Sequence, residues 1–363
     1  MKKHYALILL TLALSISGYQ SKAQWVFSQR NMAKQYSSVG LSAGSAHYFG
    51  DLARPRYFQY SLYTHVRPSV SAHYTRHFNE NFAVRMQGSW VRLYGNDYTM
   101  SQRNIDVLWQ QAVRNLHFRN DVKELAFSAI INPLPQYVSS KGAQGRAKVR
   151  PFISVGVGGI FHNPKARSNP FGYDPTTKSR VPNTSYVPDK WVSLRQYHTS
   201  GQEINGSPIK QYSLVQAVVP LGFGINYKLN DNWDFGVEGN FRFSSTDYID
   251  DVGPGRYPDL DYLKSNFGEL APMFSYRVIE SQAYNGKTLE NRIPLITQVI
   301  NNHILGPTDP QLPSYPPEEL LKYYDPTSSA TQFGVSGRKD WYFTAQVRLT
   351  YYIPYKVKCP VIK

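Results

Sequence analysis

The chain has 363 residues, a formal net charge of +15 and a mean hydropathy of −0.44. Beyond residues 1–23 it has no apolar run of the length that a membrane-spanning helix requires, which excludes a helical membrane protein. A membrane-spanning β-barrel is not excluded, because alternate residues of its strands are polar. Aromatic residues make up 14% of the chain, including 28 Tyr and 6 Trp, and suit the aromatic girdles of such a barrel.

Residues 1–23 have the pattern of a secretory signal peptide. Lysines at positions 2 and 3 precede an apolar segment, residues 6–16, that is too short to cross a bilayer. The segment Ser21-Lys22-Ala23 places small residues at the cleavage positions, so we expect the mature chain to begin at Gln24. Because Gln24 is not a cysteine, no lipoprotein anchor is indicated.

The cysteine content indicates the cellular compartment of the protein, and the net charge indicates the class of its partners. The single cysteine, Cys359, cannot form an internal disulfide. Export without a cysteine framework indicates a Gram-negative envelope rather than a disulfide-rich secreted module. An exported chain rarely meets nucleic acid, so the basic excess is expected to face outer-membrane lipids and lipopolysaccharide, or an acidic envelope partner.

The clearest structural signal runs from residue 212 to residue 245. Apolar and aromatic residues occupy every second position on both sides of a turn at residues 229–232, the pattern of an antiparallel hairpin. The positions between them carry glycines together with Asp234, Glu238 and Arg242. That mixture suits the crowded polar interior of a small transmembrane barrel whose apolar face meets lipid. A soluble hairpin also explains this stretch alone, and fails only if the pattern repeats around a closed ring.

Similar segments recur along the chain and bring the number of expected strands to eight. They are residues 37–50, 66–75, 82–90, 124–131, 153–161, 215–227, 233–244 and 341–351. An even number is what an antiparallel barrel with both termini on one side requires. We therefore expect residues 24–363 to form a single all-β domain, an eight-stranded antiparallel up-and-down outer-membrane barrel.

The connections between the expected strands alternate between short and long. The longest lie near residues 163–211 and 248–338. Short periplasmic turns and long extracellular loops are typical of outer-membrane barrels, so both termini are expected in the periplasm. Within the loops, residues 107–113 and a segment starting at residue 316 are expected to form short helices.

Several of the inward positions carry charges. An eight-stranded interior is filled by side chains, and an unpaired charge there is costly, so we expect these charges to pair around Arg85, Glu124, Glu238 and Arg348. The full set is Arg67, Arg85, Glu124, Asp234, Glu238, Arg242 and Arg348. Such a network could line an ion path, but the size of the barrel favours a plug that holds the wall together.

No pattern in the chain indicates catalysis, a cofactor or a metal. The histidines are scattered, and HExxH, paired Cys/His spacings, GxSxG and a phosphate-binding loop are all missing. We therefore expect a non-enzymatic protein. One open alternative is calcium binding by Asp247, Asp250, Asp251 and Asp259, although such a run is more often a solvated turn. Another is a nucleophile–base pair formed across loops, which sequence spacing cannot show.

Several segments resemble the PorG-type outer-membrane barrels of Bacteroidota, which belong to the type IX secretion and gliding apparatus. The matching segments are residues 47–52 (HYFGDL), 114–121 (RNLHFRND), 150–152 (RPF), 161–166 (FHNPKA), 246–252 (TDYIDDV), 257–259 (YPD) and 340–343 (DWYF). They are spread over nearly the whole mature chain. Residues 199–203, TSGQE, depart from the family's usual TEGQG.

The resemblance implies a non-enzymatic anchor that attaches a periplasmic lipoprotein ring of the secretion machine to the outer membrane. The partner surface would then lie in the periplasm. The candidate residues for that surface are Lys141, Arg146, Lys148, Tyr355, Lys356 and Lys358. Two other classes remain open, namely a surface adhesin or ligand-binding barrel that uses its long loops, and a membrane-embedded hydrolase.

Overall fold

The computed structural model of the chain describes residues 35–53, 58–79, 81–134, 142–174, 179–184, 186–204, 209–255, 257–278, 280–299, 302, 334 and 339–353. The expected signal peptide at residues 1–23 and the expected helix starting at residue 316 lie outside these ranges. Within the ranges, no helix combines the length and the apolar character needed to cross a membrane.

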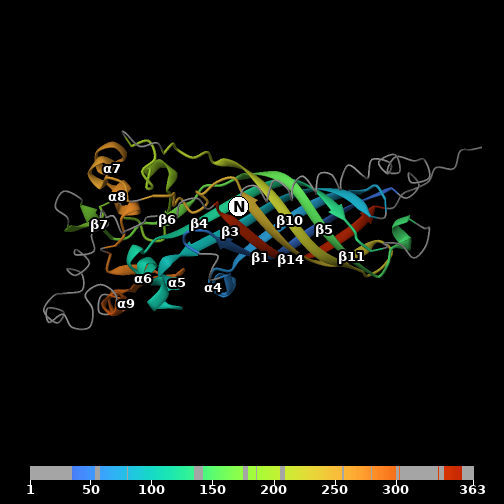
Figure 1. Cartoon of the computed structure of the whole chain (residues 1–363), viewed down its shortest axis with the longest axis horizontal. Coiled ribbons are helices and arrows are strands. Elements are labelled where there is room, and N and C mark those ends of the chain that lie inside the picture. Colours follow the sequence, from blue (N-terminus) through green and yellow to red (C-terminus); the bar gives the residue numbers. More distant parts are fainter. Residues whose placement is uncertain are drawn as a thin grey trace, which may run out of the picture.

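Eight long strands pair side by side into a closed ring (Figure 1). They are β1 (Tyr36–Phe49), β2 (Arg67–His77), β3 (Phe82–Asn96), β4 (His117–Ile131), β5 (Val149–Phe161), β10 (Val215–Lys228), β11 (Trp233–Ser244) and β14 (Trp341–Ile353). All neighbours are antiparallel in that order. The last strand returns to the first, with Ser37 opposite Ile353 and Phe49 opposite Trp341. The ring has no free edge, and the predicted eight-stranded barrel is confirmed.

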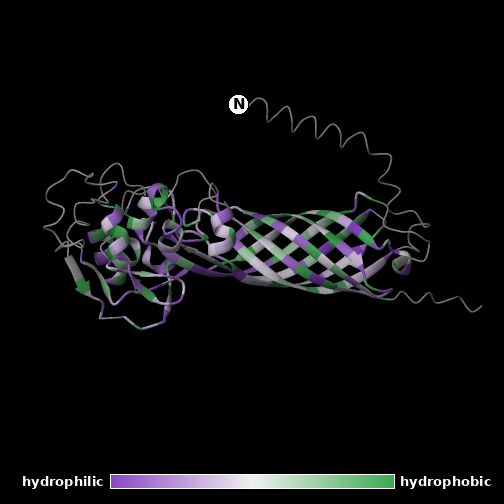
Figure 2. Cartoon of the chain, turned by 90° about the horizontal axis from the view of Figure 1, so that it is seen from below, coloured by the Kyte–Doolittle hydropathy of each residue, from purple (hydrophilic) through white to green (hydrophobic). Residues whose placement is uncertain are grey.

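The two faces of the barrel wall have opposite chemistry. On β10, Leu221 and Phe223 point outward and are exposed, whereas the intervening Pro220 and Gly222 are buried in the lumen. The same alternation holds around the ring, and Figure 2 shows apolar residues along the whole length of the wall. A soluble hairpin therefore does not describe residues 212–245, because the apolar face is the outside of a closed cylinder.

Strands β3 and β4 are longer than the sequence pattern indicates. Their pairing runs from Phe82 opposite Ile131 up to Asn96 opposite His117, so the hairpin projects beyond the other strands. Above residue 92 of β3 both faces are buried, and this removes the apolar–polar alternation by which a strand is recognised. The connection between the expected strands at residues 82–90 and 124–131 is therefore mostly strand and helix.

The long connections fold into a compact layer at one end of the barrel, which we call the cap: the described residues within 50–66, 92–121, 162–214 and 245–299. Its helices are α4 (Phe58–Thr64), α5 (Asp97–Ser101), α6 (Ile105–Arg114), η4 (Arg195–Tyr197), α7 (Leu260–Phe267), α8 (Leu270–Ser275) and α9 (Ile293–Val299). Its short strands are β6 (Lys165–Arg167), β7 (Phe171–Asp174), β8 (Ser179–Pro182), β9 (Trp191–Ser193), β12 (Gln282–Tyr284) and β13 (Leu289–Asn291). The helix predicted at residues 107–113 lies within α6.

The cap has an apolar core of its own, which explains why these connections are ordered. Leu93 and Phe118, from the projecting hairpin, pack in one cluster with Ile249, Leu263 and Ile296 from the later connections. Because the cluster joins residues far apart in the chain, no single loop could bury it.

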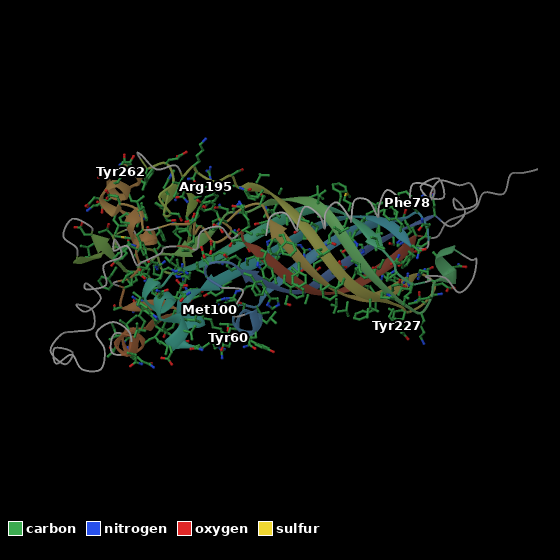
Figure 3. All side chains as sticks on the ribbon, viewed as in Figure 1. Tyr60, Phe78, Met100, Arg195, Tyr227 and Tyr262 are labelled. Atoms are coloured by element: carbon green, nitrogen blue, oxygen red, sulfur yellow. The ribbon has the colours of Figure 1, made fainter. Side chains whose placement is uncertain are left out.

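The short connections gather at the opposite end, which we call the floor. Figure 3 marks the two ends, with Phe78 and Tyr227 at the floor and Tyr262 and Met100 in the cap. The first barrel strand begins and the last one ends at the floor, where Ser37 lies opposite Ile353. The Tyr352 N–H also donates to the carbonyl of Asn232, in the turn between β10 and β11, over 2.8 Å. The 3-10 helix η3 (Gly142–Gly145) lies in one of the floor connections.

Candidate functional site

The middle of the lumen holds one carboxylate between two guanidinium groups. Glu238 of β11 accepts from Arg85 Nη1 of β3, 2.8 Å from both carboxylate oxygens, and also pairs with Arg348 of β14. Asn240 donates to the same carboxylate over 2.5 Å. All three charged side chains are almost fully buried, so the pairs replace water that the lumen excludes.

A second group of charges lies nearer the cap. Arg242 Nε donates to Glu124 Oε2 over 2.7 Å, and the Tyr342 hydroxyl donates to the same oxygen over 2.6 Å. Arg242 Nη1 also donates to Thr344 over 2.5 Å. The group ties β4 to β11 and β14 across the interior.

A third group seals the lumen at the floor. Asp234 pairs with Arg146 Nη2 at 2.9 Å and with Arg150. Arg146 also donates to the carbonyl of Asp231 over 3.1 Å, and its guanidinium lies 3.6 Å from the centre of the Tyr352 ring. Arg146 is 2% exposed. Its assignment to a partner-binding surface is therefore wrong, because the connection that carries it turns back under the barrel and inserts the side chain into the lumen.

The other predicted site residues lie elsewhere. Arg67 takes no part in the lumen pairs, because it lies at the cap end of β2 with its guanidinium 4.0 Å from the Tyr94 ring centre. Lys148 is exposed at the floor, with its ammonium 5.5 Å from the ring of Tyr227. The remaining predicted partner residues lie outside the described ranges: Lys141, Tyr355, Lys356 and Lys358.

The lumen pairs thus form separate groups rather than the single network expected from the sequence. Arg150 and Tyr342 belong to them but were missing from the predicted set. Both could have been found, since Arg150 lies on the inward face of β5 four residues before Ser154, and Tyr342 occupies an inward position of β14. A cavity inside the lumen, lined by Arg85, Arg348 and others, has a volume of only about 20 Å³, room for about one water. This favours a plug over an ion path.

The base of the cap is joined to the barrel by a shared-proton contact. The Tyr48 hydroxyl oxygen lies 2.7 Å from Asp250 Oδ2 and 2.8 Å from Asp340 Oδ1. A tyrosine hydroxyl has one proton, so the second short contact requires a proton on a carboxyl group. Burial, and then the charge of Asp51, raise the pKa of Asp250 well above its ordinary value. Burial and the charges of Asp250 and Asp247 do the same for the pKa of Asp340.

Gly50 makes this contact possible. A Cβ atom at that position would lie 1.8 Å from the Tyr48 hydroxyl and 2.0 Å from Asp340 Oδ1. Any side chain would therefore separate Tyr48 from Asp340. The geometry gives a physical reason for the glycine in the segment HYFGDL.

The acidic run after β11 does not converge on one point. Asp251 has φ of 71° and accepts from the Tyr212 hydroxyl over 2.5 Å and from Thr199. Asp259 instead caps α7, accepting from the N–H groups of Asp261 and Tyr262. In the described ranges, no group of three or more His, Cys, Asp or Glu side chains is arranged to hold a metal ion.

One hydroxyl–imidazole pair in the cap bears on the hydrolase alternative. His65 Nε2 lies 2.9 Å from Thr99 Oγ1. Burial, and then the charge of Arg67, lower the pKa of His65 to about 3, which makes the imidazole a weak base at neutral pH. Its Nδ1 has no hydrogen-bond partner among the described residues, so no carboxylate orients the ring.

Comparisons with known proteins find only distant similarity to solved structures. No protein-family model and no curated protein matches the sequence. The N-terminal β-barrel domain of OprF from Pseudomonas aeruginosa is 7% identical, with a TM-score of 0.29 over 88% of this chain and 99% of that chain. Ail, the attachment invasion locus protein of Yersinia pestis, solved with the heparin analogue sucrose octasulfate, is 7% identical, with a TM-score of 0.30 over the same shares. Likeness this low carries no argument about function.

The first prediction concerns the central lumen group. Glu238→Gln leaves Arg85 and Arg348 buried without a carboxylate, and we expect a loss of about 3–5 kcal/mol in the free energy of unfolding. The measurement is the temperature at which the folded barrel unfolds in detergent, followed on unheated gels. Glu269→Gln is the control, because that side chain is 74% exposed. Equal unfolding temperatures for the two variants would contradict the pairing.

The second prediction concerns the pH dependence of the cap. Burial raises the pKa of Asp251 to about 7 from the ordinary 3.8. Because the raised pKa belongs to the folded state, protonated Asp251 stabilises the fold fully below about pH 4. This contribution falls by about 1.4 kcal/mol per pH unit as the pH rises from about 4 to about 7, and it is then lost. Hydrogen exchange of the amides at residues 246–252, corrected for intrinsic rates, should speed up over that range.

Asp251→Asn tests the assignment of this pH dependence. The variant should flatten the pH dependence of exchange, whereas Asp261→Asn, at an exposed position of α7, should leave it unchanged. An unaltered slope in Asp251→Asn would assign the effect to other groups.

Proposed function

We propose that this protein is an outer-membrane barrel that anchors a periplasmic ring lipoprotein of the type IX secretion and gliding machinery. The observation that carries the proposal is a sealed barrel with a rigid floor. The lumen is filled by paired charges, and the floor connection at residues 142–148 is fixed to the neighbouring turn by Arg146. Such a molecule offers a membrane anchor and a fixed surface rather than a passage.

The apolar wall supports residence in a membrane. A closed ring of strands satisfies its backbone hydrogen bonds internally, which a lipid environment requires. The exported chain and the barrel form favour the outer membrane, with the cap outside the cell and the floor in the periplasm. Both ends of the barrel sequence then lie on the periplasmic side, where the resemblance to PorG-type barrels places the partner.

The floor geometry revises the expected partner surface. Arg146 acts as a positioning residue, because its contacts with Asp234 and the carbonyl of Asp231 hold the connection in place. Lys148 remains as an exposed cation beside the Tyr227 ring. We propose that Lys148 and the tail that carries Tyr355, Lys356 and Lys358 bind an acidic face of the lipoprotein.

A surface-binding role is the second candidate. The folded cap, with its own apolar core, favours it, because a fixed outer surface suits recognition more than unstructured loops do. Binding of a host or glycan surface by the barrel, together with no lipoprotein capture, would favour this role over the anchor.

The third prediction tests the anchor. Lys148→Glu should weaken capture of the periplasmic ring lipoprotein roughly tenfold, because it reverses a charge at the contact. Deletion of residues 356–363 should act in the same direction while the barrel stays inserted. The measurement is cross-linked co-purification from native membranes. Lys190→Glu, at an exposed position in the cap, is the matched control. Unchanged capture by both floor variants would reject the proposal.

A further inference from the structure

Two hollows adjoin on the outer face of the barrel. The first is an apolar groove of about 620 Å³ in the wall, lined by residues that include Leu41, Ala72, Gly88 and Trp90. The second is a cavity of about 470 Å³ between the barrel and the cap, lined by residues that include Arg67, Arg92, Arg119 and Lys287. One hollow is apolar and the other is strongly basic.

The strands make the two hollows continuous. Val70 and Trp90 are cross-strand partners on β2 and β3, and both line the groove. Pro68 and Arg92, two residues further toward the cap on the same strands, line the cavity. Because side chains two positions apart share one face of a strand, the apolar groove leads directly into the basic cavity.

The groove is open because small residues form its base. Ala72 of β2 and Gly88 of β3 are cross-strand partners, with Leu41 of β1 opposite Ala72. Ala43 and Trp90 lie in the next outward row, on either side of Val70. A Cβ atom at Gly88 would meet nothing within 4 Å. The wall therefore has a recess of the shape that an alkyl chain fills.

The cavity holds more positive than negative charge. Asp121 pairs with Arg92 Nε at 2.6 Å and lies 3.6 Å from Arg119 Nε, so one carboxylate faces two guanidinium groups. Arg67 and Lys287 add two further positive charges to the lining. Arg119 Nε has no hydrogen-bond partner among the described residues, and its guanidinium lies 4.4 Å from the ring centre of Trp191.

Arg67 is held in the cavity in a similar way. Its guanidinium lies against the ring of Tyr94, and its Nη1 donates to the carbonyl of Val66 over 2.8 Å. Aromatic rings thus keep the guanidinium groups of Arg67 and Arg119 in place while leaving donors for an anion.

We propose that the groove and the cavity together bind one phosphorylated glycolipid of the outer leaflet. An acyl chain lies in the groove, and the phosphate groups of the sugar lie among Arg67, Arg92, Arg119 and Lys287. A ligand with both parts fits, because the basic cavity opens onto the lipid-facing wall. The assignment to the outer leaflet rests on the proposed orientation, with the cap outside, and is independent of the periplasmic partner.

The fourth prediction tests the basic cavity. The purified barrel in detergent is titrated with diphosphoryl lipid A, and the complex is measured by native mass spectrometry. We expect one lipid per barrel, bound at least about tenfold more weakly by the double variant Arg119→Gln with Lys287→Gln. Lys210→Gln, at an exposed position elsewhere in the cap, should bind like the wild type. Equal affinity of the double variant and the wild type would overturn the proposal.

The groove is tested by filling it. Gly88→Leu should weaken lipid A binding at least about tenfold, because its side chain occupies the recess. Gly159→Leu is the matched control, since Gly159 also points outward and a Cβ there would come no closer than 4.0 Å to another atom. An equal loss in both variants would show that the groove is not specific.

A comparison with other phosphate-bearing ligands tests whether the bound molecule is a glycolipid. Soluble glucosamine 1-phosphate should bind at least about a hundredfold more weakly than diphosphoryl lipid A, because it lacks the acyl chain. Equally tight binding of the soluble sugar phosphate, or of phosphatidylglycerol, would overturn the glycolipid assignment. Since no periplasmic partner is present, these outcomes are distinct from failure of the anchor.

Discussion

The pairing of the last barrel strand with the first is the constraint on which the rest of the molecule depends. β14 meets β1 along its whole length, from Ser37 opposite Ile353 to Phe49 opposite Trp341, so the sheet has no free edge. A wall without an edge can satisfy every backbone group and place apolar side chains against lipid. The price is a narrow interior, and the charges that alternate with the apolar residues must then pair within it.

The pairs inside the barrel differ in role along its axis. Glu238 binds Arg85 and Arg348 at the centre, and Glu124 with Arg242 ties strands together near the cap. Asp234 closes the floor by pairing with Arg146, from the connection before β5, and with Arg150 of β5. The same interior therefore stabilises the wall, favours a plug over an ion path and fixes the surface that we propose for the partner. At the other end, the Tyr48 contact fixes the cap to the barrel.

The sequence predicted the barrel well because a strand between lipid and a polar lumen keeps a period of two. Where a strand leaves the boundary between lipid and lumen, the alternation ends and the prediction of the strand failed. The upper part of β3, including Leu93 and Tyr94, is buried on both faces, so its alternation is lost. The core of the cap joins distant segments such as Phe118 and Ile296, which spacing in the sequence cannot connect.

The candidate site was predicted in part for the same reasons. Arg85, Glu238 and Arg348 were placed in the lumen by their position in the alternation alone. Arg146 was assigned to the surface because a basic residue in a connection usually meets solvent, and nothing nearby in the sequence indicates its contact with Asp234. Arg67 has the expected inward position but lies at the rim, where the cap provides Tyr94 as its neighbour.

The central claim is that the apolar side of the wall contacts acyl chains while the charged side is enclosed. The most direct test is to refold the mature chain with and without detergent and to measure its mass and secondary structure by light scattering and circular dichroism. The account predicts a folded β-rich monomer in detergent and aggregation in plain buffer. A folded, soluble monomer in plain buffer would contradict it.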